Sequence, residues 1–226
     1  PRGGRPRHRP AALWALLCGC LPAPALGAGP PREEETEDTT RRLSLYGSEL
    51  QKCDRPAYMK ANPGAADTRF PHTGYTRDDY CGSMTGDMGS HYVCVQLPTA
   101  VTAGGKVYSN FWTKTGQAGS AEQAAASWPK PGPWCICMWA FARMRGHHPE
   151  FTELVDCSAT NYWVVQNYDL ANANECLALQ ALCASCGLES DKAQRESIRR
   201  KCGMARELCP PEADAGKCTV QGGCEL

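Results

Sequence analysis

Residues 91–97 read HYVCVQL, and this stretch decides how the rest of the chain is interpreted. Its residues alternate between two faces, with His91, Val93, Val95 and Leu97 on one and Tyr92, Cys94 and Gln96 on the other. Alternation with a period of two is typical of a half-buried β-strand. Residues 134–138 (WCICM) follow a Pro-rich turn and predict the next strand. The proline directly before them does not argue against a strand, because proline is tolerated at that position.

Segments of both kinds surround these two strands. Residues 139–145 predict a short helix, whereas 154–157 and 162–168 predict further short strands. Residues 102–127 are rich in Gly and Ala and predict a loop with some helix. The mixture indicates an α+β core of a small mixed sheet with short helices.

The composition changes near residue 171. Residues 175–186 (ECLALQALCASC) predict a helix, for which Gly187 is a suitable C-cap. Residues 190–208 also favour a helix, which the two prolines at 210–211 would end. We therefore expect a core domain at 43–171 and a Cys-rich helical tail at 172–226.

The first residues have the pattern of a secretory signal peptide, predicted at 1–28. Four arginines precede an apolar run at 11–21, and small residues follow it. That run is shorter than the ~20 residues that a membrane-spanning helix needs. Residues 29–42 contain acids and prolines but no apolar residue, and they predict a disordered acidic spacer. We expect a secreted or lumenal protein with no transmembrane segment in its mature chain.

Cysteine content and charge narrow the class of protein. Two of the 15 cysteines lie in the predicted signal, and the remaining 13 suit an oxidising compartment and a disulfide framework. Because 13 is odd, at least one thiol is free, intermolecular or bound to something else. The 24 basic residues balance the 24 acidic ones, which argues against a general polyanion binder, so no nucleic-acid partner is expected.

Cysteine spacing in the tail predicts a disulfide-stapled helical hairpin. Cys176 and Cys183 are seven residues apart, as are Cys202 and Cys209, so each pair shares one helix face. Antiparallel helices could be joined by the nested bridges Cys183–Cys202 and Cys176–Cys209. If the turn sits tightly at 187–190, Cys176–Cys202 becomes the natural bridge instead. With the nested bridges, we expect Cys186 to join Cys218 or Cys224.

Four stretches occur in an order that resembles a known family: HTGYTRDDYC at 72–81, DMGSHYVCV at 87–95, KPGPWCIC at 130–137 and SATN at 158–161. Over roughly residues 45–177 the chain resembles the domain of unknown function 2237 (DUF2237). The signal peptide and the Cys-rich tail lie outside that pattern, and Asn161 stands where the family has His. The resemblance implies the identity of the core domain but no mechanism.

The candidate catalytic residues are Asp87, His91 and Cys135. A carboxylate can fix an imidazole tautomer, and the imidazole can then activate a thiol. Cys94 is three residues from His91 and faces the other side of the strand, whereas Cys135 from a neighbouring strand could meet His91. Cys135 and Cys137, with one residue between them, are expected to share a face of their strand. His91, Cys135 and Cys137 are weak candidates for a metal site, and no metal or cofactor is expected. The structural alternatives are ordinary disulfides and a histidine that anchors the turn at 86–90.

The leading hypothesis is a non-catalytic secreted or lumenal protein, either an interaction module with a protein partner or a subunit of a larger assembly. The alternative is a metal-binding or thiol-dependent enzyme with its site near Asp87, His91 and Cys135–Cys137.

Overall fold

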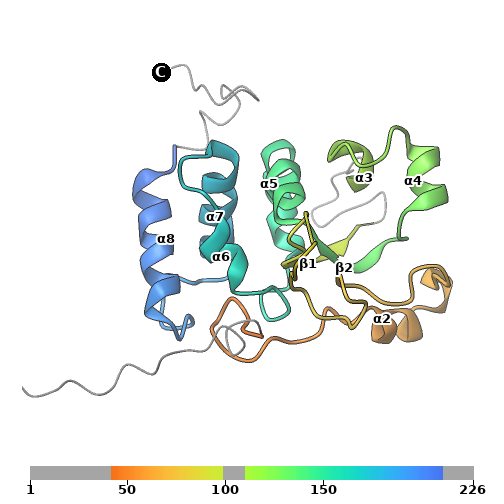
Figure 1. The fold of residues 1–226 in the computed structure, drawn as a ribbon, viewed down its shortest axis with the longest axis horizontal. Coiled ribbons are helices and arrows are strands. Elements are labelled where there is room, and N and C mark those ends of the chain that lie inside the picture. The colour runs from red at the N-terminus through yellow and green to blue at the C-terminus, as the bar shows by residue number, and fades with distance from the viewer. Residues whose placement is uncertain (1–41, 99–109, 211–226) are drawn as a thin grey trace, which may run out of the picture. The chain divides into compact units, whose positions relative to one another are not determined.

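The computed structural model describes residues 42–98 and 110–210. The predicted signal peptide, the predicted spacer up to residue 41, Cys218 and Cys224 lie outside these residues. The described elements follow one another along the chain (Figure 1) as α2 (Arg55–Ala61), η1 (Pro63–Ala65), β1 (Val93–Leu97), α3 (Phe111–Lys114), α4 (Ala121–Ser127), β2 (Gly132–Ile136), α5 (Met138–His147), η3 (Pro149–Leu154), α6 (Trp163–Asn167), α7 (Ala173–Ser185) and α8 (Glu196–Leu208).

Strands β1 and β2 pair antiparallel, and Cys94 lies directly opposite Cys135. Four of the five residues in each strand are buried. The predicted α+β fold is confirmed, and the sheet among the described residues has these two strands. The regular strand starts two residues later than the predicted one, and His91 makes an isolated bridge with Gly82.

The second strand ends earlier than the sequence predicted. Strand β2 stops at Ile136, and Cys137 is the N-cap of α5. The N–H of Met138 donates to the carbonyl of Ser90, which ties the start of the helix to the segment before β1. Cys135 and Cys137 therefore do not share one face of a strand, because the backbone changes from extended to helical between them.

The predictions of strands at 154–157 and 162–168 were wrong. Leu154 ends the 3-10 helix η3, and Val155 forms only an isolated bridge with Val95. Residues 163–167 form helix α6. Asn161 lies two residues before this helix, and its Oδ1 accepts the N–H of Trp163 over 3.0 Å. A local side-chain hydrogen bond of this kind, made one residue before the N-cap Tyr162, competes with the extended conformation that valines favour.

Helices α5, α7 and α8 belong to one hydrophobic core. Helix α7 packs against both α5 and α8 (Figure 1). Phe141 and Met144 of α5, Leu179 and Leu182 of α7, and Ile198 of α8 lie in the same cluster of buried side chains. Helix α8 begins six residues later than predicted, because the preceding loop pairs with another part of the chain: the N–H of residue 194 donates to the carbonyl of residue 46.

Helices α7 and α8 form the predicted disulfide-stapled hairpin. Disulfides join Cys176 to Cys209 and Cys183 to Cys202, which is the nested arrangement. The reversal takes up the residues between Ser185 and Glu196, long enough to place the four cysteines at matching levels.

The expected partner of Cys186 was wrong. Cys186 caps the C-terminus of α7 and forms a disulfide with Cys157, just after η3. Helix α7 packs against η3, which brings the two cysteines together. Reasoning confined to the tail could not find a partner that lies in the preceding segment.

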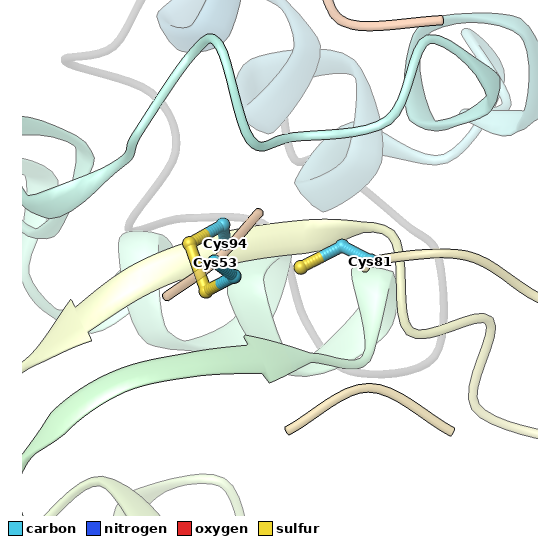
Figure 2. Close-up of side chains that lie close together, drawn as sticks. All are labelled: Cys53, Cys81 and Cys94. Atoms are coloured by element: carbon cyan, nitrogen blue, oxygen red, sulfur yellow. A yellow bond between two sulfur atoms is a disulfide. The ribbon is translucent and has the colours of Figure 1, made fainter. Parts of the chain in front are cut away.

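Two further disulfides lie side by side at the sheet. Cys53 joins Cys94, and Cys81 joins Cys135 (Figure 2 shows the first bridge with Cys81 beside it). Because Cys94 and Cys135 are opposite one another in the register, both bridges leave the same region of the sheet. Together with Ala159 these cysteines form a second, small buried cluster.

No helix in the described ranges is both long and apolar enough to cross a membrane. The five disulfides among the described residues indicate an oxidising environment.

Candidate functional site

The segment between Cys81 and β1 positions Asp87 against His91. Asp87 Oδ1 lies 2.8 Å from His91 Nδ1, and the side chain of Asp87 is 1% exposed. The backbone N–H groups of Gly89 and His91 donate to the two carboxylate oxygens over 3.0 and 3.1 Å. Gly86 and Ser90 have positive φ angles, 95° and 49°, which let the chain turn tightly enough to make these bonds.

This environment keeps Asp87 ionised. Burial alone would raise the pKa of its carboxyl, but the hydrogen bonds from His91 and Gly89 and the charge of His91 outweigh burial, so the pKa lies below the ordinary 3.8. An ionised carboxylate can only accept, so Nδ1 of His91 carries the proton that it donates. In the neutral imidazole Nε2 is then left as the acceptor.

Cys137 is the third member of the site. Its Sγ lies 3.4 Å from Nε2 of His91, on the far side of the ring from Asp87. It is the free cysteine of the described residues, and it is buried at the N-terminus of α5. Burial and, second, the negative charge of Asp87 raise the pKa of the thiol to about 11. The thiol is therefore protonated at neutral pH.

Carboxylate, imidazole and thiol thus lie in the order that nucleophilic catalysis requires. Asp87 orients His91, and Nε2 of His91 is placed to take the proton of Cys137 as sulfur attacks a substrate. The N-terminus of α5 adds the positive end of a helix dipole at the thiol.

The predicted site is partly corrected by this geometry. Asp87 and His91 lie together as expected, but Cys135 is bonded to Cys81 and has no thiol to offer as nucleophile or metal ligand. Cys137, which the sequence suggested only as a weak metal ligand, takes the expected place of Cys135 beside His91. The odd number of cysteines indicated that at least one of them lacks an intramolecular disulfide partner, but it did not identify Cys137.

A cavity of about 290 Å³ adjoins the thiol and the imidazole. Aromatic side chains form much of its wall: Tyr75, Phe111, Trp112, Trp128 and Trp134. The rings of Trp112 and Trp128 are stacked, with centroids 4.4 Å apart. Arg77 and Gln117 add polar groups to the wall.

The other cysteines near the sheet are not arranged to hold a metal. In the described ranges, Cys53, Cys81 and Cys94 have sulfur atoms within 4.8 Å of one another (Figure 2). All three are bonded in disulfides, so they offer no thiolate. Among residues 42–98 and 110–210, His91 and Cys137 offer two ligand atoms at the candidate site, fewer than the three or four protein ligands of a zinc site.

Asn161 contacts the backbone of Cys81 and does not belong to the candidate site. Its Nδ2 donates to the carbonyl of Cys81 over 2.9 Å, and its side chain is buried. It does not line the cavity beside Cys137.

Comparison with known proteins leaves the family open. No family model matches the chain, and no curated protein matches it. The resemblance to DUF2237 therefore stays a prediction. The stretches that carry the resemblance do meet at one place, since residues 72–81 supply Arg77, 87–95 supply His91, and 130–137 supply Trp134 and Cys137.

Proposed function

We propose that this chain is a thiol-dependent enzyme that transfers or hydrolyses acyl groups. The observation that carries the proposal is the line of contacts from Asp87 through His91 to the free thiol of Cys137, with distances of 2.8 and 3.4 Å. The adjoining cavity gives a substrate room beside the sulfur. These contacts favour the enzymatic alternative over a histidine with a purely structural role, because a structural histidine needs no free thiol at its second nitrogen.

The proposed reaction has two steps. Cys137 Sγ attacks the carbonyl carbon of an ester or thioester while its proton passes to Nε2 of His91. The leaving group takes that proton as its bond to the acyl carbon breaks, which leaves an acyl-thioester on Cys137. Water then attacks the thioester, with His91 as base, and releases the acid and the thiol. Because burial raises the pKa of this thiol to about 11, no thiolate is formed in advance, and the scheme requires His91 to remove the proton during the attack itself.

The test measures hydrolysis of a panel of small p-nitrophenyl esters and aryl thioesters and traps the acyl intermediate by intact mass. Cys137→Ser and His91→Ala are expected to lower the rate by about 10²- to 10⁴-fold. His72→Ala is the matched control, because His72 makes a similar 2.8 Å contact with Asp79 and its side chain is half exposed. An unchanged rate in Cys137→Ser, or an adduct at another residue, would refute the proposal.

A second candidate is the interaction module expected from the sequence. Four large apolar side chains are exposed on the segments that carry the site: Tyr75, Met84, Met88 and Trp139, of which Met88 is 95% exposed. An apolar segment of a partner protein would cover such groups. Peptides selected against the wild-type protein should then bind Cys137→Ser normally and lose affinity for the double variant Met84→Ser/Met88→Ser. Peptides that bind this double variant as tightly as the wild type would refute the module.

We propose further that the protein works in the secretory pathway or outside the cell, as the basic and apolar N-terminus and the disulfides suggest. N-terminal sequencing of the secreted protein is expected to find a start between residues 26 and 30. A mature chain that retains residues 2–11 would exclude this location.

A further inference from the structure

We propose that the cavity beside Cys137 recognises a small aromatic compound that carries one carboxylate, with the carboxylate on Arg77 and the ring against the tryptophans. The identity of this ligand as a substrate rests on the proposed function, but its binding does not. The carboxylate in question is separate from the carbonyl group that Cys137 would attack.

Arg77 is the cation of the cavity wall. Its guanidinium carbon lies 5.1 Å from the ring centroid of Trp134, within the range of a cation–π contact. Its backbone has a φ of 61°, which is unfavourable for a residue with a side chain, and its N–H donates to the carbonyl of Gly74. The local turn therefore fixes the backbone of Arg77 beside the cavity, and the contact with Trp134 directs its guanidinium.

Arg77 lacks the carboxylate that a comparable arginine has. Arg55 also lies 5.1 Å from the ring centroid of Trp134, but it is fully buried and makes a 3.0 Å ion pair with Asp67. Within residues 42–98 and 110–210, Arg77 is exposed and has no carboxylate partner. Its fork of N–H donors is free to bind a carboxylate in the bidentate manner.

The remaining wall suits a flat apolar body. Trp112 and Trp128 are stacked with an interplanar angle of 19°, and both line the cavity together with Trp134. The volume of about 290 Å³ lies just below the range for drug-sized small-molecule sites, ~300–1,000 Å³, which favours a small ligand. A single guanidinium and a small aromatic enclosure match one ring with one negative charge better than a larger polyanion.

The experiment measures equilibrium binding to Cys137→Ser, so that turnover plays no part. The probes are phenylacetate, the neutral phenylacetamide and acetate, titrated while the indole N–H signals of the tryptophans are followed by NMR. Phenylacetate is expected to bind about 10- to 100-fold more tightly than phenylacetamide, because charged hydrogen bonds to Arg77 are lost in the amide. Acetate, which has no ring, is expected to bind more weakly than phenylacetate.

In Arg77→Gln the preference for phenylacetate over phenylacetamide should disappear. The matched control is Arg200→Gln on the exposed face of α8, which should keep the preference. Equal affinity for acid and amide, an unchanged preference in Arg77→Gln, or no binding of phenylacetate would overturn the inference. Selective binding without ester hydrolysis would instead refute the proposed function and leave this inference standing. Hydrolysis that depends on Cys137, together with equal affinity for phenylacetate and phenylacetamide, would overturn this inference and leave the proposed function standing.

Discussion

At the scale of single residues, the carboxylate of Asp87 both orients His91 and contributes to the stability of the fold. The pKa of Asp87 is below its ordinary value in the folded chain, so ionised Asp87 stabilises the fold above about pH 4, and this contribution is lost as the pH falls through the folded pKa. Asp87→Asn is expected to lower the free energy of unfolding by about 1–3 kcal/mol at neutral pH. The difference from the wild type should shrink in acid.

Urea unfolding at neutral pH and below the folded pKa of Asp87 measures this difference. Asp191→Asn, at an exposed carboxylate, is the control and should change stability little at either pH. A loss of stability in Asp87→Asn that is as large in acid as at neutral pH would contradict the ionised state that we assign.

The thiol of Cys137 gives a second prediction at this scale. With a pKa of about 11, it should react slowly with iodoacetamide at neutral pH, and the rate should rise about tenfold per pH unit in the alkaline range. Because the charge of Asp87 contributes to the raised pKa, Asp87→Asn should label faster than the wild type at the same pH. Peptide mapping under non-reducing conditions follows the adduct at Cys137. Rapid labelling of the wild type at neutral pH would show that the thiolate already exists.

Sequence reasoning placed Asp87 and His91 in the candidate catalytic site but chose Cys135 as its thiol and named Cys137 only as a weak metal candidate. Asp87 and His91 are close in the chain, and their contact follows from a local turn. Identifying Cys137 instead of Cys135 required knowing that Cys135 bonds to Cys81, a contact across 54 residues. No local pattern encodes such a pairing.

At the scale of elements, the turn before β1 approaches the start of α5 closely enough to require a glycine. A Cβ on Gly89 would lie 2.4 Å from Sγ of Cys137 and 3.0 Å from Cε1 of His91. Gly89→Ala is therefore expected to push the thiol and imidazole apart and to destabilise the fold by about 1–3 kcal/mol.

The matched control is Gly203→Ala within α8, where an added Cβ meets nothing within 4 Å. That change should stabilise the protein by about 0.5–1 kcal/mol, because alanine favours a helix more than glycine does. Thermal unfolding and the alkylation rate of Cys137 are measured for both variants. A Gly89→Ala protein with normal stability and normal labelling would show that the turn and the helix start are not in firm contact.

Periodicity predicted elements well where they were regular, and poorly where a side chain or a distant backbone group set the conformation. The residues of β1 and α7 follow their patterns almost to the ends. Residues 163–167 do not, since they form helix α6, whose first N–H donates to the side chain of Asn161. The boundaries of such elements depend on contacts that propensity does not include.

At the scale of the whole molecule, the hairpin of α7 and α8 shares its core with α5, although the sequence predicted a boundary near residue 171. That boundary stays a prediction. The shared core leads us to expect one cooperative unfolding transition, even in the double variant Cys157→Ala/Cys186→Ala. Loss of this bridge, which spans 29 residues, should cost about 2–4 kcal/mol.

Calorimetry and tryptophan fluorescence should report the same midpoint for this variant, as two-state unfolding requires. Cys183→Ala/Cys202→Ala is the control, because it removes a bridge inside the hairpin and leaves the Cys157–Cys186 bridge intact. Two separate transitions after loss of the Cys157–Cys186 bridge would instead support independent domains.

The two sheet disulfides have a consequence for how the site arises during maturation. Cys81 and Cys94 stand at the two ends of the segment that carries Asp87 and His91, and each is bonded to a partner elsewhere. The two disulfides anchor both ends of this segment. We therefore expect its alignment with Cys137 to require that both bonds have formed. Under the proposed mechanism, a newly made chain would be inactive until both bridges have formed, so the compartment that supplies the oxidant would also set where activity begins.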